Sequence, residues 1–374
     1  MPRPDSDSLL RRARLAQVQP HDPNQPTGPL PPSELSALQE SQDKGPWLIL
    51  WDVVGSCNLR CPSCPQGTMR GANPKGFVDV DLFTRILDHL RAHVSTPQLH
   101  FYNWTEPLLH PEIGRLCHLA VERGFHLHLS SNLNHLPDPD AVMSSGMKTF
   151  RVSLSGFTQG VYARGHRGGR IEKVKENMRR LSESKTRTGA RTRLHVYYLK
   201  YRDNLHEIEP MRAYAESLGF EWQEDWAYLM PLEKVFDYLE DRMPAQEKDF
   251  ADSRMVPRVD SFFALGQHWG ADHCLLIDQL VLDHLGNVIQ CCAVFEQKDY
   301  VLGHALELNW RELQARRYRS AVCAKCHHYG CPQVFTYQSH PVLRPVAMQL
   351  VDEQLHAPPR TSADRLVALP VLGS

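Results

Sequence analysis

The sequence predicts an α/β protein in which six strands alternate with helices, followed by a smaller α+β module that is rich in cysteine. First, short β-rich runs between residues 48 and 228 alternate with amphipathic helical patterns, which is typical of βα units around a parallel sheet. Second, the pattern changes after about residue 230 to a helical connector and a cysteine-bearing region. Third, 374 residues with 42% hydrophobic side chains suffice for roughly two domains.

The six expected strands are short, and several of them end in polar sequence. They span residues 48–54, 98–103, 126–131, 149–155, 193–198 and 221–228. Between them apolar side chains repeat at helical spacing, as at Leu82, Ile86 and Leu90. The polar stretches GSCNLRC, NWTEP, SSNLN and SLSGFT follow the first four strands. Because ligands bind at the carboxyl ends of the strands in parallel α/β barrels, we expect these stretches to share one site.

Composition along the chain predicts four stretches. Residues 1–45 are rich in Pro, Gln, Ser and Asp, and we expect a mostly disordered lead-in with one possible helix near Leu9 to Val18. Residues 46–230 hold the βα units, and residues 231–340 hold the connector and the cysteine-rich module. Residues 341–374 are expected to form a loose tail.

Charge and hydropathy exclude several classes of partner. Lys and Arg total 42 against 43 for Asp and Glu, so no strong field attracts nucleic acid or anionic lipid. The N-terminal MPRPDSDSLLRRAR has no apolar run after its basic residues, and no apolar run approaches the roughly 20 residues that span a bilayer. We therefore expect a cytoplasmic protein. In that compartment thiols stay reduced, so we expect its ten cysteines to include metal ligands rather than to form disulfides.

Three cysteines lie on one short loop directly after the first expected strand. In CNLRCPSC, Cys57, Cys61 and Cys64 can hold three corners of a 4Fe-4S cluster and leave the fourth iron open. An open iron can chelate S-adenosylmethionine (SAM), and electron transfer into that complex can yield a 5′-deoxyadenosyl radical. The alternatives are ordinary buried thiols or part of a zinc site, which would need a fourth ligand from outside the loop.

Together with two further segments, this loop resembles the radical SAM superfamily over about residues 47–230. FYNWTEPLLHPEI is similar to the family's glycine-glycine-glutamate segment, with Trp104 and Thr105 in place of the glycines and Glu106 matching. The resemblance implies contact with the methionine amino group through a backbone carbonyl and Glu106. The family position before the third cysteine is usually aromatic and is Ser63 here, so adenine stacking must come from elsewhere.

The segment VSLSGFTQGVYARGHRGG resembles the part of the family's fourth strand that approaches the methionine carboxylate. By this resemblance Ser153, Ser155 and Arg167 are candidate carboxylate contacts. Otherwise the serines bond their own loop and Arg167 lies on a solvated basic face. Ser130, at the end of the third strand, can also face the cofactor. The resemblance further implies a partial (β/α)6 TIM-like barrel and an electron donor such as flavodoxin or ferredoxin.

A second set of cysteines follows in the C-terminal module. QLVLDHLGNVIQC predicts a β-hairpin that brings Cys274 and Cys291 together. The later CAKC places Cys323 and Cys326 on one tight turn and completes four thiolates of the kind that fully ligate an iron–sulfur cluster. The arrangement resembles the auxiliary-cluster domains called SPASM and twitch. The shorter twitch form fits better, which implies one auxiliary 4Fe-4S cluster.

Other uses of these residues stay open. A zinc knuckle can be built from CAKCHHYGC at residues 323–331, since this segment satisfies tetrahedral zinc on its own. Cys292 can replace Cys291 as a ligand, and Cys292 and Cys331 are possible hydrogen donors. His126 and His128 alternate along a strand and are interpreted as structural.

A radical generator beside a fully ligated second cluster predicts an oxidation. We expect reductive cleavage of SAM, hydrogen-atom abstraction and dehydrogenation of a small polar metabolite such as a sugar or cyclitol. Peptide or protein modification, by thioether or carbon–carbon crosslinking or by epimerisation, is the alternative. The lead-in before Trp47 is too short and proline-rich for a folded peptide-recognition domain. A non-catalytic iron–sulfur or zinc protein is the alternative from a different class.

Overall fold

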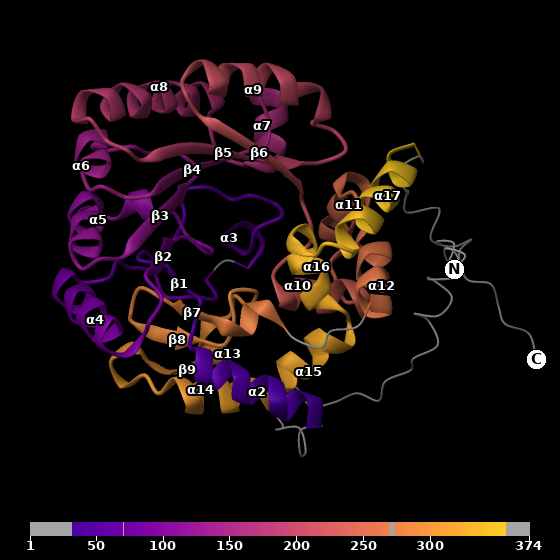
Figure 1. The fold of residues 1–374 in the computed structure, drawn as a ribbon. Helices are drawn as coiled ribbons and strands as arrows, with labels where there is room; N and C mark the ends of the chain where they lie inside the picture. Colours follow the sequence, from indigo (N-terminus) through magenta and orange to yellow (C-terminus); the bar gives the residue numbers. More distant parts are fainter. Residues whose placement is uncertain (1–31, 70, 270–273, 357–374) are drawn as a thin grey trace, which may run out of the picture.

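The computed structural model describes residues 32–69, 71–269 and 274–356 of the 374-residue chain. The helix expected near Leu9 to Val18 lies outside these residues. In the described part, nine strands form one sheet with the order β6-β5-β4-β3-β2-β1-β7-β8-β9. Figure 1 shows the first six strands along an arc, with helices outside it. The α/β fold class, a partial barrel with a C-terminal module, is confirmed.

The six expected strands are all present and run parallel to their neighbours. They are β1 (Leu48–Trp51), β2 (Gln98–Phe101), β3 (His126–Ser131), β4 (Thr149–Leu154), β5 (Arg193–Lys200) and β6 (Glu221–Trp226). Side chains alternate between two faces, so Leu99 and Phe101 are fully buried in the main core while His100 lies on the opposite, inward face.

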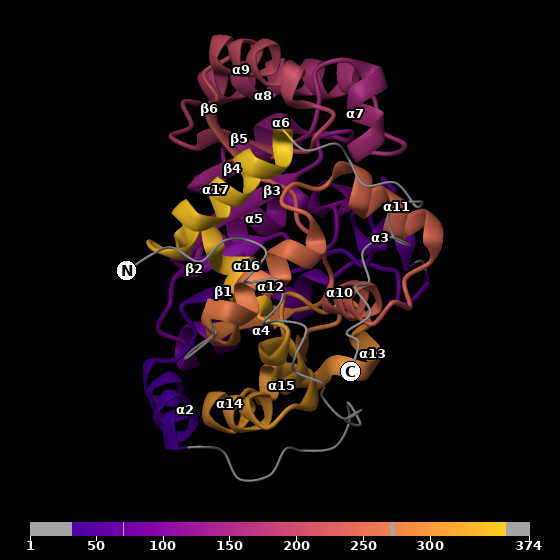
Figure 2. The same ribbon diagram turned by 90° about the vertical axis from the view of Figure 1, so that its right-hand side faces the viewer.

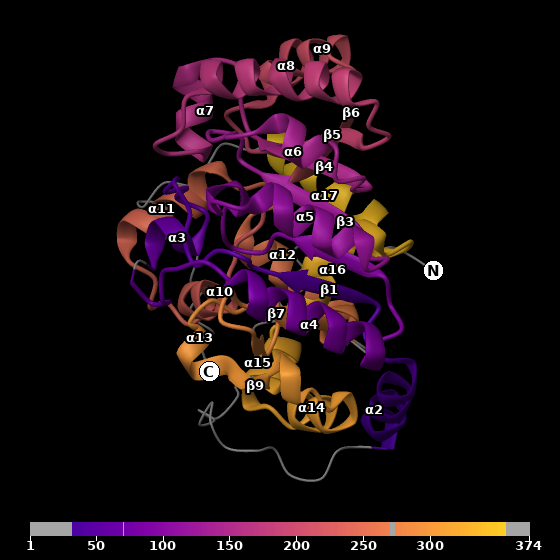
Figure 3. The same cartoon turned by 90° about the vertical axis from the view of Figure 1, so that its left-hand side faces the viewer.

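Helices cover the outer face of the arc (Figure 3). They are α4 (Val80–His93), α5 (Ile113–Glu122), α6 (Pro139–Met143), α7 (Gln159–Gly165), α8 (Ile171–Thr188) and α9 (Ile208–Ser217). Helix α4 begins after Asp79, whose carboxylate accepts from the N–H groups of Asp81 and Leu82 at 2.9 and 3.0 Å. This cap satisfies two of the N–H groups that a helix start leaves unpaired.

The C-terminal module continues the barrel sheet. Strand β7 (Gln279–Leu282) pairs in parallel with β1, and β8 (Asn287–Ile289) and β9 (Val301–His304) follow as antiparallel neighbours. The predicted hairpin is confirmed by the β7–β8 pairing. Gly286 turns it with φ +83°, a conformation that favours glycine, and the Asp283 carboxylate accepts from the N–H groups of Leu285 and Asn287.

Further helices lie at the open side of the arc (Figure 2). They are α10 (Leu232–Leu239), α11 (Ala245–Arg254), α12 (Val259–Trp269), α13 (Gln297–Tyr300), α14 (Trp310–Tyr318), α15 (Ala321–His328), α16 (Cys331–Thr336) and α17 (Leu343–His356). Leu48, Leu50 and Val281, on the inward face of β1 and β7, share a second core with α10, α11, α12, α15, α16 and α17. Leu313 of α14 belongs instead to the main core. Within the described ranges, no helix has both the length and the apolar character needed to cross a membrane.

Both ends of the described chain are more ordered than we expected. Helix α2 (Pro32–Lys44) falls in the lead-in predicted to be disordered, and α17 falls in the predicted loose tail. Helix α2 lies beside α14, where Trp310 Nε1 donates to the Ser41 carbonyl at 2.9 Å (Figure 3). Helix α17 is held by Gln354, whose Oε1 accepts from the Arg258 N–H at 2.6 Å. These distant contacts supply order that local composition does not predict.

Candidate active site

The NWTEP segment is fixed to the end of β1 by one buried carboxylate. Asp52, 4% exposed, accepts from the N–H groups of Asn103 and Trp104, each at 3.1 Å, and from Thr105 Oγ1 at 2.7 Å. Burial raises the pKa of Asp52 to about 6, and these donors act against that rise. Asp52 was not among the predicted site residues, although an acidic residue inside an otherwise apolar expected strand was a usable signal.

Glu106 links the segments that follow β2 and β3. Its Oε1 accepts from Ser131 Oγ at 2.7 Å and from the Leu108 N–H at 3.1 Å, and its Oε2 accepts from the Asn132 N–H at 2.8 Å. Burial raises the pKa of Glu106 to about 7. Its own N–H donates to the Ser56 carbonyl at 3.1 Å, next to the cysteine loop. Three of the four predicted loops therefore meet at this carboxylate, and its contact with SAM stays a prediction.

The three cysteines of the loop lie close enough for their thiols to influence one another, and two nearby donors reach the sulfur of Cys57. Asn132 Nδ2 lies 3.6 Å from Cys57 Sγ, and the Leu59 N–H lies 3.4 Å from the same sulfur. Burial raises the pKa of Cys57 and Cys61, and raises that of Cys64 to about 11.

Such buried thiols become ligands when a bound metal compensates the thiolate charge, and N–H donors to sulfur tune iron–sulfur clusters. The loop therefore fits a three-cysteine 4Fe-4S cluster.

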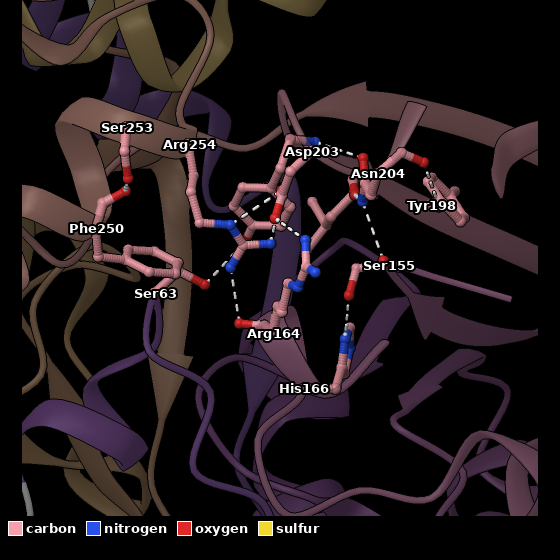
Figure 4. A network of polar contacts seen from close by, with 12 residues as sticks. Ser63, Ser155, Arg164, His166, Tyr198, Asp203, Asn204, Phe250, Ser253 and Arg254 are labelled. Atoms are coloured by element: carbon pink, nitrogen blue, oxygen red, sulfur yellow. Dashed lines mark hydrogen bonds and ion pairs between the residues drawn. The ribbon is translucent and has the colours of Figure 1, made fainter. Parts of the chain in front are cut away.

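Tyr201, directly after β5, places an aromatic ring beside the cysteine loop. Its hydroxyl lies 2.9 Å from Ser63 Oγ, at the position where the family usually carries an aromatic residue. Arg254 of α11 lies over the Tyr201 ring at 4.7 Å and donates from Nε to Asp203 at 3.0 Å (Figure 4). Tyr201 is 1% exposed, so its ring packs against the buried side of the cysteine loop. Local sequence offered no signal that would pair Ser63 with Tyr201.

The candidates predicted near the methionine carboxylate separate into different environments. Ser155 is 1% exposed, its Oγ lies 2.6 Å from His166 Nδ1, and its carbonyl accepts from Asn204 Nδ2 at 3.0 Å (Figure 4). Ser155 is thus used within the protein, which agrees with the alternative that it bonds its own surroundings. Ser153 lies on the inward face of β4 and is half-buried.

Two further residues predicted to contact SAM, Arg167 and Ser130, form hydrogen bonds within the protein. The Arg167 side chain is exposed, but its carbonyl accepts from the Arg60 N–H at 2.9 Å. Its backbone, not its guanidinium, therefore touches the cysteine loop. Ser130 Oγ accepts from Arg151 Nε at 3.0 Å inside the barrel. The contacts of these residues with SAM stay predictions.

The four cysteines predicted for an auxiliary cluster line one pocket of the C-terminal module: Cys274, Cys291, Cys323 and Cys326. Most of its other lining residues are apolar, such as Leu232 and Phe335. Gln290 Nε2 lies 3.1 Å from Cys323 Sγ, and the Ala293 N–H lies 3.4 Å from Cys291 Sγ. The neighbouring Cys292 thiol lowers the pKa of Cys291. A mostly apolar pocket with N–H donors aimed at sulfur fits an iron–sulfur cluster.

The zinc knuckle stays an alternative to the auxiliary cluster. Among the described residues, no group of three or more His, Cys, Asp or Glu side chains is placed to hold a single metal ion. Tetrahedral zinc requires four ligands around one point, whereas cluster ligands bind separate iron atoms and need not converge. Cys331 is fully buried beside Cys326 and does not line the pocket.

Comparison with known proteins identifies the domain that the barrel forms. Residues 52–215 match the model of the Radical SAM superfamily. This chain carries a radical SAM domain. Members of the superfamily use a 4Fe-4S cluster and SAM, and the three-cysteine loop lies within the matched residues. The recognition made from the sequence is therefore confirmed for the barrel, while the auxiliary domain stays a prediction.

Individual relatives of the radical SAM domain are distant. The tungsten-containing aldehyde ferredoxin oxidoreductase cofactor-modifying protein of Pyrococcus furiosus is 25% identical over 174 residues, 45% of this chain and 48% of the relative. The match thus spans about half the length of that curated protein.

Among solved structures, Streptococcus suis SuiB bound to S-adenosylmethionine has a TM-score of 0.50 at 13% identity, covering 79% of this chain and 71% of SuiB. The anSMEcpe enzyme with bound AdoMet has a TM-score of 0.50 at 14% identity, covering 81% and 99%. At these identities the likeness shows the fold.

Proposed function

We propose that this protein is a radical SAM enzyme that cleaves SAM reductively and oxidises a small polar substrate. The observation that carries the proposal is the meeting of the three-cysteine loop, through Cys57, with the Glu106 and Asn132 loops at the carboxyl ends of β1, β2 and β3. When bound, the cluster and SAM supply the 5′-deoxyadenosyl radical that removes a hydrogen atom from the substrate. The chain itself binds, orients and keeps water from the reacting groups.

The second part of the proposal is an auxiliary 4Fe-4S cluster held by Cys274, Cys291, Cys323 and Cys326, which accepts the electron left on the substrate. The loop after Cys291 supports this role, because it contacts the first site: Trp104 Nε1 donates to the Val294 carbonyl at 2.9 Å. The two cysteine sets are therefore joined through one hydrogen-bonded loop pair. Loss of a hydrogen atom and then of one electron and one proton gives a two-electron oxidation.

A small polar substrate is supported by the lining of the barrel. The inward positions of β2 to β5 carry polar side chains such as His100, His128, Arg151 and Tyr197. The Pyrococcus relative is named a cofactor-modifying protein, which is compatible with a small-molecule substrate. SuiB has been solved with its precursor peptide SuiA, so precursor peptides form the second arm of a substrate screen.

The test is formation of 5′-deoxyadenosine from SAM by anaerobically reconstituted protein with dithionite. We expect the native protein to form it and Cys57→Ala to form none. Cys117→Ala is the control for loss of a thiol, because Cys117 is a free cysteine that lies on α5 away from both sites. An iron content of about eight atoms per chain supports two clusters. An iron content of about four atoms per chain, together with bound zinc, supports the zinc knuckle. If the native protein forms no deoxyadenosine, the proposal of an enzyme fails and a non-catalytic metal-binding protein is the remaining interpretation.

A further inference from the structure

Arg151 lies in the barrel interior between two aromatic rings. Its guanidinium carbon is 4.2 Å from the centre of the Tyr102 ring and 4.9 Å from that of Tyr197, and its Nε donates to Ser130 Oγ at 3.0 Å. Within the described ranges, no carboxylate forms an ion pair with Arg151, and Asp225 lies beside Tyr197 instead. The guanidinium is thus held in place by one edge and both faces while its charge has no protein counter-ion.

The groups around Arg151 do not neutralise its charge. His195 is its register partner on β5, and His100 lies next to Tyr102, with Nδ1 2.6 Å from the tyrosine oxygen. Burial lowers the pKa of His100 to about 3 and also lowers that of His195 and His128, and in each case the nearby Arg151 adds to the effect. Neutral imidazoles around a fixed cation leave a positive potential that favours an anionic ligand.

A basic pocket opens at the end of the barrel opposite the cysteine loop. Its lining includes the first residues of β2 to β5 and the cations Lys148 and Arg191. Arg193 also lines it but is paired with Glu221 of β6. His128 also lines this pocket, and its ring lies 4.5 Å from that of His100. His128 thus lies between this pocket and the His100–Tyr102 pair beside Arg151. Cations at a pocket raise the local concentration of anions.

We propose that Arg151 binds a carboxylate or phosphate group of the substrate, which enters through this basic pocket. The free edge of the guanidinium can pair with two oxygen atoms of one anion, the geometry in which Arg binds such groups most strongly. Ser153 follows on the same face of β4, about 7 Å closer to the cysteine loop. An anion on Arg151 thus directs the rest of the substrate toward the radical source. This inference rests on the proposed function and names its substrate class.

The test measures anion binding to reconstituted, SAM-loaded protein by equilibrium dialysis with radiolabelled inorganic phosphate and, separately, succinate. We expect Arg151→Gln to weaken binding of the preferred anion about 10- to 100-fold, the usual cost of losing a charged hydrogen-bonded pair. Arg151→Lys should retain part of the affinity, because it keeps the charge. Arg91→Gln is the matched control, since Arg91 also lies over an aromatic ring, 5.3 Å from Phe125, but on outer helix α4.

Each result bears on the proposal. Weaker anion binding in Arg151→Gln, with SAM affinity retained and with anion binding by Arg91→Gln equal to that of the native protein, supports the proposal. The preferred probe identifies carboxylate or phosphate. Equal binding by Arg151→Gln and the native protein overturns it, as does loss of binding only in Arg191→Gln, which would place the anion in the outer pocket. A fall in SAM affinity in Arg151→Gln would assign the residue to the cofactor. Failure of SAM cleavage in the native protein would count against the proposed function and leave the anion measurement interpretable.

Discussion

Around the three-cysteine loop, backbone N–H groups converge on the buried carboxylates of Asp52 and Glu106, whereas beside the four-cysteine pocket backbone carbonyls converge on a buried guanidinium. Arg317 is fully buried and donates to the carbonyls of Ile277 and Gln279 from Nη1 and to that of Ile289 from Nη2, at 2.8 to 2.9 Å.

The difference follows from what each region leaves unpaired. Loops that follow the ends of parallel strands present N–H groups without strand partners, and a carboxylate can accept several of them at once. The short hairpin of the C-terminal module presents carbonyl groups, and a guanidinium with its five N–H donors can form hydrogen bonds to several of them at once. The first site is therefore organised by two buried carboxylates and the second by one buried guanidinium, and loss of any of these groups leaves several backbone groups unsatisfied.

The largest expected effect separates the roles of the two cysteine sets. Cys61→Ala should abolish deoxyadenosine formation, because it removes a ligand of the proposed SAM-binding cluster. Cys323→Ala should lower the iron content by about four atoms per chain yet retain deoxyadenosine formation without substrate turnover. Chromatography of the nucleoside and iron analysis of the same samples check both outcomes. Equal loss of deoxyadenosine in the two variants would show that the sites do not act separately.

The next effect tests the guanidinium. Arg317→Met should lower the free energy of unfolding by about 3 kcal/mol, because three buried carbonyls lose their donor. Arg316→Met is the control: Arg316 is exposed and pairs with exposed Glu312, a contact worth about 0.5 kcal/mol or less. Urea unfolding of the metal-free proteins measures both. Similar values for the two variants would contradict the organising role of Arg317.

Much of the barrel was predictable because its signals are local. Strand β3 begins and ends at the predicted residues, and the strand-end loops that carry Cys57, Glu106 and Ser131 meet as expected. A parallel arrangement forces such loops to one edge of the sheet, so the period of the sequence was enough.

The supporting residues were not predictable, because their partners are distant in sequence. Arg317 stands in the basic run RRYR and reads as a surface residue, yet it is buried against a hairpin about 30 to 40 positions earlier. Ser63 and Tyr201 are 138 positions apart, and no spacing rule links them. Helix α2 likewise gains its order from α14. Which side chains meet across such separations depends on the assembled fold.

A smaller effect is expected at the first site. Asp52→Asn should lower the free energy of unfolding by about 2 kcal/mol, since an amide has one acceptor oxygen and its NH2 group must face the donors that the carboxylate now accepts from. Asp79→Asn is the matched control, because Asn caps a helix about as well as Asp and the change should be within about 0.5 kcal/mol. Urea unfolding checks both, and an unchanged stability in Asp52→Asn would argue against the carboxylate as the organising group.

The smallest expected effect concerns a third carboxylate, Glu207, which receives the N–H groups of Phe157 and Thr158 at 2.6 and 3.0 Å and also the Thr158 hydroxyl. Burial alone would raise the pKa of Glu207, but the Thr158 hydroxyl and the two N–H donors outweigh it, so the pKa lies below its ordinary value of 4.5. The folded state then holds fewer protons than the unfolded state, and the stabilisation is complete above about pH 4.5 and lost as the pH falls through the lowered pKa.

Glu207→Gln should therefore cost about 1 kcal/mol near neutral pH and progressively less toward about pH 3. Exposed Glu209, which pairs only with Arg212, is the control, and Glu209→Gln should change little at either pH. Urea unfolding across this range measures the two profiles. If the loss of unfolding free energy caused by Glu207→Gln stays the same as the pH falls, the N–H donors do not stabilise the ionised form of Glu207. In that case only Asp52 and Glu106 would support the difference between the barrel, organised by carboxylates, and the module, organised by a guanidinium.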